Sequence, residues 1–317
     1  MMLWLARRIA ISIGLVWIVA SIVFLTIRMI PGNPAEMLLS QGGVAPDPAS
    51  VAELKQQLGL DRPLLAQYGA SMIGLVRGNL GDSLQDGSPV MGDILARLPR
   101  TLELIAAAGL FAVLVGVPAG ALAAIRCGGF YDRVGSWLAG LWLSVPIFVT
   151  GTLLILLFAQ TLRWLPAGGY VPFAQSPLQF LALLAMPAFT IGAGLAGAVF
   201  RMTRAAVLDV VGREHVRAAR AKGIGPLLVL RRHVLRNAMI PVVTVLGLQL
   251  GGLLGGTVLV EYVFNWPGVS SLLFDAVNAR DYTLVQGIVL VISVLFVALN
   301  LLVDILYAVL DPRVRHG

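Results

Sequence analysis

The side chains with the greatest capacity for chemistry in this sequence are nine Lys and Arg residues between positions 201 and 236. Only Asp209 and Glu214 oppose them in that stretch. A cluster of this kind can attract anionic lipid or dock against another protein. Very apolar runs lie on both sides, so the segment is expected to stay in water between two membrane spans. The nine residues are Arg201, Arg204, Arg213, Arg217, Arg220, Lys222, Arg231, Arg232 and Arg236.

The middle of this basic segment predicts a short helix. Residues 214–222 are good helix formers, with alanine at 218, 219 and 221. Gly223 tolerates a left-handed cap, so the helix is expected to end there, and Pro226 prevents its resumption. A second amphipathic helix should then run into the next span.

Three interpretations of the basic segment are open. It can be an orientation signal with no partner, a helix on anionic lipid, or a helix that docks on a protein. Ala218, Ala219 and Gly223 would let another surface approach closely, with charged side chains around them. A lipid-surface helix would instead carry bulky apolar residues on one face, and this one has few. Composition alone favours the orientation signal. The small and charged residues at these positions instead favour protein docking.

The composition is that of a polytopic membrane protein. The 317 residues are 58% hydrophobic and 12% charged, whereas soluble domains carry about 25% charged residues. The basic residues cluster beside predicted spans, so the formal charge of +7 does not indicate nucleic acid.

Nothing in the sequence indicates catalysis or a resident cofactor. A single cysteine, Cys127, excludes an internal disulfide and a cysteine-based metal site. The three histidines, His215, His233 and His316, fall in segments expected to be exposed to water. The chain has no phosphate-binding loop, no zinc-protease motif and no serine elbow. We therefore expect a non-enzyme without metal or cofactor.

Six spans are predicted, together with one large soluble segment. The first apolar run is long and lacks a cleavage site, so it is expected to be an uncleaved anchor that ends at Pro31 and Pro34. Residues 31–98 should form an external region with two or three short helices. The expected divisions are an anchor (1–30), the external region (31–98) and a core (99–312) that contains the basic loop (201–237). The spans are expected at about 9–30, 101–125, 134–162, 178–200, 238–260 and 284–310.

The charge distribution predicts the orientation of these spans. Fifteen of the 23 Lys and Arg residues fall at the two termini, the 126–133 loop and the basic segment, which the positive-inside rule places in the cytoplasm. Most of the others lie in or beside the long external region, where the rule has little force. Both termini are thus expected to be cytoplasmic.

Small and polar residues in the spans are candidates for contacts within or between subunits. Glycines recur every four residues in the fifth span and permit tight packing within the chain or against a partner; they are Gly247, Gly251, Gly252, Gly255 and Gly256. Polar residues in spans usually face protein or a water path. Glu103, Gln249, Asn300 and Asp304 are therefore candidates to face a pore or a partner, and for Asp304 a structural role is favoured.

Several motifs resemble those of permease subunits of ABC importers, in the dipeptide, oligopeptide and nickel branch. The superfamily loop reads Glu-Ala-Ala, three residues, Gly, nine residues, Ile, one residue, Leu-Pro. Here Arg217-Ala218-Ala219 precedes Gly223 by the same spacing, whereas His233 and Arg236 replace the expected Ile and Pro. These departures resemble the peptide branch, whose loop reads ARAKG followed by HxxxNAxxP. External motifs such as GLDRP and NWPG, and the C-terminal span, are also similar to that branch.

The resemblance implies an all-α fold of the type I ABC importer class in a bacterial inner membrane. It also implies a second homologous permease, two cytoplasmic ATPase subunits that bind ATP and Mg²⁺, and an external binding protein. The ligand would be a dipeptide, oligopeptide, glutathione or nickel chelate. The residues expected to couple the permease to the ATPases are Glu214, Arg217, Ala218, Ala219, Lys222, Gly223, His233, Asn237 and Pro241.

Two other classes of function fit the sequence less well. A secondary transporter or an ATP-independent channel would want ionisable residues at the bilayer midplane, but Glu103 and Asp304 both lie near span ends. A membrane-embedded hydrolase would need a nucleophile and a base within a span, and no predicted span contains such a pair.

Overall fold

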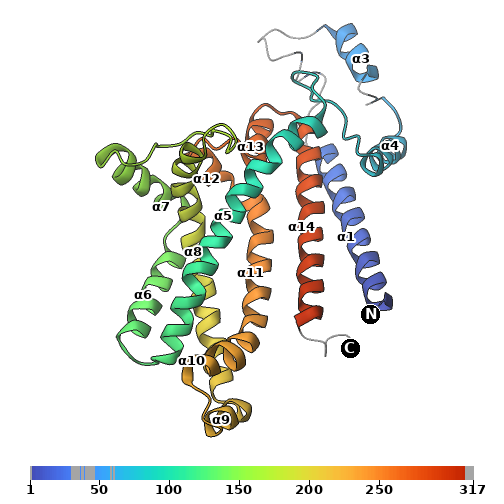
Figure 1. Ribbon diagram of the computed structural model, residues 1–317. Coiled ribbons are helices and arrows are strands. Elements are labelled where there is room, and N and C mark those ends of the chain that lie inside the picture. Colours follow the sequence, from blue (N-terminus) through green and yellow to red (C-terminus); the bar gives the residue numbers. More distant parts are fainter. Residues whose placement is uncertain are drawn as a thin grey trace. The chain divides into compact units, whose positions relative to one another are not determined.

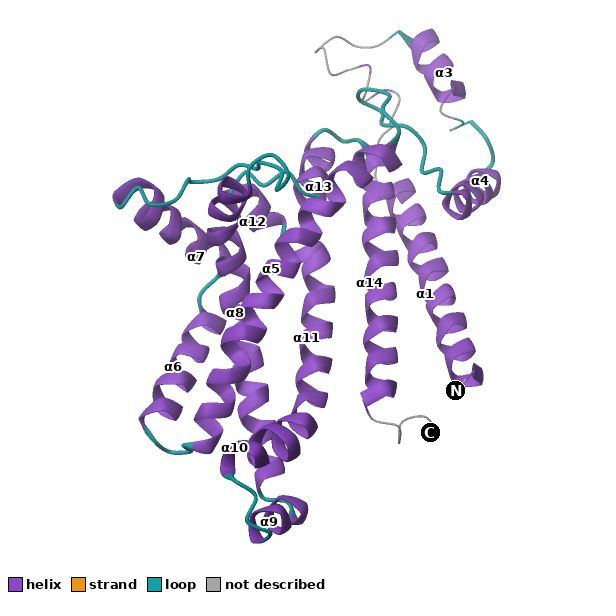
Figure 2. Cartoon of the chain, in the orientation of Figure 1, coloured by secondary structure: helices purple, strands orange, loops and turns teal. Residues whose placement is uncertain are grey.

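The computed structural model describes residues 2–29, 36, 39, 47–57, 59 and 61–310. Within these residues the chain is helical and contains no strand, only an isolated bridge between Asp82 and Pro89 (Figures 1 and 2). The predicted all-α class is confirmed. The expected helix end at Pro31 and Pro34 lies outside the described residues, as does His316.

Five helical stretches are long and apolar enough to cross a membrane. They lie within α1 (Met2–Met29), α5 (Val90–Ile125), α8 (Pro177–Val211), the run Pro226–Gly256 and α14 (Tyr282–Leu310). The fourth of these runs consists of α10 (Pro226–Val229), a π-helical segment (Leu230–Leu235) and α11 (Arg236–Gly256). Five of the six predicted spans therefore correspond to these helices.

The third predicted span is not one continuous helix. It consists of α6 (Phe130–Ser144) and of α7 (Ile147–Leu154), which continues into a π-helical segment, Ile155–Thr161. The two halves are bent by 101°. Val145 between them is extended (φ −78°, ψ 126°), because the residue before a proline is driven out of the helical region. The span predicted at about 134–162 is therefore a bent pair of helices, and the described residues hold six spans if this pair counts as one.

The chain divides into two compact units. The first comprises Arg100–Ser271 and Ala298–Gly317, and the second Met2–Pro99 and Leu272–Val297. In the first unit α8 contacts α6, α7 and α11, and about half of its residues, nearly all of them apolar, are buried. A helix that is apolar all round and buried belongs at the centre of a bundle.

The second unit joins α1 to α4 (Leu64–Arg77) through one aromatic side chain. The Tyr68 hydroxyl lies 2.7 Å from that of Ser21, and its ring packs edge-on against Trp17 and Phe24. With α3 (Pro48–Gln57), α4 supplies the short helices expected between 31 and 98.

The loop after α4 in the same unit is fastened by Asp281. Its carboxylate accepts hydrogen bonds from the Ser83 hydroxyl (2.6 Å) and the Leu84 amide (3.1 Å), and also from the Leu284 amide at the start of α14. The turn-rich strip around Ser83 is thereby tied to the beginning of that helix.

Candidate functional site

The basic segment folds as a short helix, α9 (Glu214–Ala221), in the first unit (Figure 1). An acidic residue, Glu214, occupies its first turn and Arg220 its last, in the order that the helix dipole favours. Val216 and Ala219 are buried, whereas Glu214, Arg217 and Ala218 are exposed. The helix therefore has one apolar edge and one broad charged face.

The apolar edge of α9 belongs to a buried cluster shared with its neighbours. Val216 and Ala219 lie in one hydrophobic cluster with Val207 and Val210 of α8, and with three residues of the run that follows, Val229, Val234 and Ala238. Burial of such side chains stabilises by about 25 cal/mol per Å² of apolar surface. The helix is thus packed against both α8 and the start of the next span.

The turn after α9 has the predicted geometry. Lys222 caps the helix, and Gly223 follows with φ +77°. The Gly223 amide donates to the Arg220 carbonyl (2.9 Å), and the Ile224 amide donates to the Ala219 carbonyl (3.3 Å). A Cβ on Gly223 would meet nothing within 4 Å, so it is the backbone conformation that requires glycine here.

Three further candidate residues lie in the π-helical segment and in the first two turns of α11: His233, Asn237 and Pro241. His233 is within the π-helical segment, and its carbonyl accepts a hydrogen bond from the Asn237 side-chain amide (2.9 Å). Pro241 lies inside α11 and cannot donate to the carbonyl four residues earlier. Irregular helix turns of this kind often occur at functional sites. The amide of Asn237 supplies a partner where the regular ladder is disturbed.

The structure corrects the expected exposure of one coupling residue. Ala219 was expected to lie where a partner approaches, but it is 5% exposed and packs inside its own chain. Its neighbour Ala218 faces outward. Which of two adjacent alanines is buried depends on α8 and α11, so the sequence of α9 did not distinguish them.

The glycines of the fifth span separate into two environments. A Cβ on Gly247 would overlap the Val303 side chain, and Gly251 is also buried. Gly252, Gly255 and Gly256 are exposed, with nothing within 4 Å of a Cβ. Gly247 therefore serves packing within the chain, and the other three leave an open surface.

The four polar span residues lie on three helices: Glu103 on α5, Gln249 on α11, and Asn300 and Asp304 one turn apart on α14. Glu103 is half-buried, and its Oε2 accepts a hydrogen bond from the Tyr170 hydroxyl (3.3 Å). Gln249 is exposed, and Asp304 is half-buried. The Oδ1 atom of Asn300 is buried and has no hydrogen-bond partner among the described residues, which is costly within one chain. Among the described residues no group of His, Cys, Asp and Glu could hold a metal ion.

Sequence reasoning assigned no role to Glu261, which is fully buried in α12 (Val258–Val263). Its Oε1 accepts from the hydroxyls of Thr101 (2.8 Å) and Thr257 (3.0 Å), and its Oε2 accepts from the Ser271 amide (2.7 Å). Burial raises the pKa of this carboxyl, while the hydrogen bonds oppose that shift. An acidic residue at the end of an apolar run, four positions before the NWPG turn, is the sequence signal for it.

A second unforeseen interaction joins α6 to α8. Arg204 donates from Nε to Asp132 Oδ1 (2.5 Å) and from Nη2 to Oδ2 (2.8 Å). This two-pronged geometry is the strong form of a guanidinium–carboxylate pair. It also withdraws Arg204 from the set of basic residues available to a partner.

The chain matches the model of the binding-protein-dependent transport system inner membrane component over residues 116–316. The N-terminal model of the same kind of component matches residues 1–105. The chain belongs to this family.

Relatives that match this permease over their full length are named as permease proteins of transport systems. It is 40% identical over 316 residues to the glutathione transport system permease protein GsiC of Escherichia coli (strain K12), covering 100% of both chains. It is 39% identical over 336 residues to the di/tripeptide transport system permease protein DppB of Pseudomonas aeruginosa (strain UCBPP-PA14), covering 100% of this chain and 99% of the relative.

Solved structures of ABC transporters share the fold of this permease. An inward-facing structure of the MetNI methionine ABC transporter has a TM-score of 0.57 at 18% identity, over 70% of this chain and 97% of that one. An amino acid ABC transporter crystallised with histidines has a TM-score of 0.51 at 17% identity, over 68% and 93%. The predicted importer-permease fold is confirmed.

The family membership decides between the classes of function considered from the sequence. This permease is a multi-pass inner-membrane subunit of an ABC importer and not an enzyme. The secondary transporter and the membrane hydrolase are therefore set aside.

Proposed function

We propose that this permease forms half of a pore for short peptides or for a peptide-like compound such as glutathione. The support is the full-length similarity to relatives named for glutathione and for di- and tripeptides. A second, homologous permease would complete the pore, and an external binding protein would deliver the ligand. ATP and Mg²⁺ would be bound by two separate ATPase subunits.

The observation that carries the coupling part of this proposal is the two-sided character of α9. Its inner edge, Val216 and Ala219, is packed against α8 and the start of the Pro226–Gly256 run. Its outer face is exposed and basic, with Arg217 and Arg220 flanking Ala218. A subunit that moves the outer face must therefore move the spans to which the inner edge is attached. This is how a rigid-body change can pass between subunits.

The charge of the outer face also restricts the partner. Arg217, Arg220 and Lys222 are exposed, and Glu214 is the single acidic residue within α9. An ATPase groove that receives this helix should be acidic around a small apolar floor for Ala218. Complementary charge of this kind fixes the partner and the register of docking.

The second permease is expected to contact the open glycine surface of α11. Gly252, Gly255 and Gly256 would allow a partner helix to approach closely in lipid, where small residues favour helix association. A heterodimer of homologous permeases is proposed on this basis.

The proposed orientation places α9 and both termini in the cytoplasm, as the positive-inside rule requires. Cys127 would first be replaced by serine, and a single cysteine then introduced as Ser50→Cys or Gly225→Cys, both at exposed positions. A membrane-impermeant maleimide applied to intact spheroplasts should label only Ser50→Cys. Labelling of Gly225→Cys under these conditions would overturn the orientation.

The coupling proposal is tested with Ala218→Glu, because a long acidic side chain there adds bulk and reverses the local charge without entering the buried cluster. The expected result is loss of ATPase subunits from the purified complex and loss of uptake of a radiolabelled dipeptide and of glutathione. Ala70→Glu makes the same change at an exposed alanine of α4 and should leave ATPase retention unchanged. Normal retention and uptake in Ala218→Glu would leave α9 without a coupling role.

A further inference from the structure

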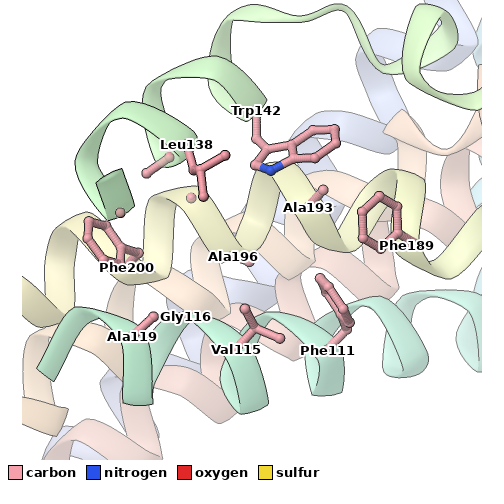
Figure 3. A pocket seen from close by; sticks show the side chains of 13 residues that line it. Phe111, Val115, Gly116, Ala119, Leu138, Trp142, Phe189, Ala193, Ala196 and Phe200 are labelled. Carbon is pink, nitrogen blue, oxygen red and sulfur yellow. The ribbon is translucent and has the colours of Figure 1, made fainter. Parts of the chain in front are cut away.

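An apolar groove runs between α5, α6 and α8 in the first unit. It has a volume of about 230 Å³, and thirteen side chains or glycines from these three helices line it (Figure 3). None of the thirteen is charged. Figure 3 shows side chains of all three helices around it, including Val115 of α5, Leu138 of α6 and Phe200 of α8. Since all three helices belong to predicted spans, this groove lies at the depth of lipid hydrocarbon.

The two ends of the groove differ. One end is aromatic, where Phe189 packs edge-on against Phe111 (5.3 Å between centroids) and Trp142 (5.5 Å). The other end lies at Phe200 and Gly135. Eleven residues of α8 separate Phe189 from Phe200, which corresponds to about 16 Å at 1.5 Å per residue. One leaflet contributes about half of a hydrocarbon core that is about 30 Å thick. The groove is therefore as long as one leaflet's hydrocarbon layer.

Basic side chains begin where the groove ends. Arg201 directly follows Phe200, and Arg133 lies two residues before Gly135; both are exposed. Arg126, at the end of α5, is also exposed, and its guanidinium lies 4.7 Å from the centre of the Tyr131 ring. The nearby carboxylate, Asp132, is already held by Arg204. Within the described residues, no carboxylate pairs with Arg126, Arg133 or Arg201.

We infer that this groove binds one acyl chain of an anionic phospholipid, whose phosphate group lies against Arg126, Arg133 and Arg201. An uncharged groove about as long as one leaflet's hydrocarbon layer, followed along the chain by arginines that have no carboxylate partner within the described residues, is complementary to an amphiphile with an acidic head. The inference concerns lipid and is independent of which ligand is transported.

The first test maps the occupant directly. The complete importer would be reconstituted in nanodiscs of phosphatidylcholine with a small fraction of phosphatidylglycerol carrying a diazirine on one acyl chain. Photolysis and peptide mass spectrometry should place the label on the α5 segment 111–119 and the α6 segment 135–142. Labelling spread evenly over the exposed faces of α1 and α14, with none in these segments, would overturn the site.

Two sets of variants test the acyl chain and the head group separately. Val115→Trp should fill the groove and reduce its labelling to background, while Leu114→Trp, on the neighbouring exposed position of α5, should not. Arg133→Gln and Arg201→Gln should each weaken competition by unlabelled phosphatidylglycerol about fivefold, the change expected from about 1 kcal/mol per basic residue. Arg163→Gln, at an exposed position outside the basic end, is the matched control.

Two outcomes would contradict parts of the inference. Equal labelling by a phosphatidylcholine analogue, unaffected by the arginine variants, would remove the anionic head group from it. Crosslinking of a photoreactive residue at Leu138 to the second permease, without lipid labelling, would show that a protein surface covers the groove.

Discussion

Thr101 donates a hydrogen bond of 2.8 Å to Oε1 of Glu261, a residue 160 positions further along the chain. The same hydroxyl accepts the amide of Val269 (2.8 Å). A single threonine thus connects the helix α5 to both sides of the NWPG turn. Since the carboxylate is fully buried, the hydrogen bonds that it accepts stabilise the packing of α5 against α12 and the NWPG turn.

Replacing Thr101 with valine should destabilise the permease by about 2 kcal/mol, the typical contribution of a hydrogen bond to a charged group. The change keeps the side-chain shape but leaves the Val269 amide without its partner. Denaturant titration in mixed micelles would measure the loss. Thr152→Val is the control, because the exposed Thr152 hydroxyl bonds only to a carbonyl of its own helix. An equal effect of both changes would contradict a special role for Thr101.

The stability of this network should depend on pH. Burial raises the pKa of Glu261, which lies outside the predicted spans, above its ordinary value of 4.5. Over the interval between the ordinary and the raised pKa, the folded state holds more protons than the unfolded state. The free energy of unfolding should therefore fall as pH rises through that interval and level off above it. Glu261→Gln should remove this slope from the thermal midpoint measured at a series of pH values.

The pair Arg204–Asp132 should behave as one unit. Asp132→Ala and Arg204→Ala are each expected to lower the thermal midpoint, and the double variant should be no worse than the worse single one, because residues in one pair are not additive. The exposed pair Arg213–Asp209 is the control, since exposed pairs contribute little. Additive effects of Asp132→Ala and Arg204→Ala would show that the contact is not coupled.

Two substitutions around α9 should affect the folding or stability of the permease, whereas Ala218→Glu should affect only its docking to the ATPases. Ala219→Glu places a charge in the cluster that holds the helix, so the permease should be recovered in low yield before any docking is tested. Gly223→Ala should cost about 1 kcal/mol, because alanine disfavours a positive φ. Gly225→Ala is the matched control at a negative φ. Sensitivity of the turn to limited proteolysis would report both glycine variants.

The two glycine environments of α11 predict different failures. Gly247→Leu should unfold the permease itself, because the side chain would overlap Val303; adding Val303→Ala should recover part of the yield. Gly252→Leu and Gly256→Leu should leave the single chain stable and reduce recovery of the second permease in a pull-down. Normal recovery with both would place this surface against lipid.

Features of the fold that depend on local residue type could be predicted from the sequence. Features that depend on contacts between residues far apart in sequence could not. The end of α9 at Gly223 depends on one backbone angle, so the residue type predicts it. The bend before Pro146 was missed because a proline within a span can also be accommodated in a continuous helix, as Pro187 is in α8. The burial of Ala219 and of Glu261 depends on residues far away in sequence, whose positions no local pattern specifies.

The packing of α9 has a mechanical consequence for the proposed coupling. A flexible linker transmits tension only, because it buckles when it is compressed. Val216 and Ala219 pack α9 against α8 and the start of the Pro226–Gly256 run. Helix α9 can therefore transmit displacement towards the membrane as well as away from it. The ATPases would then drive both conformational changes of the transport cycle, the opening of the pore and its return, through α9.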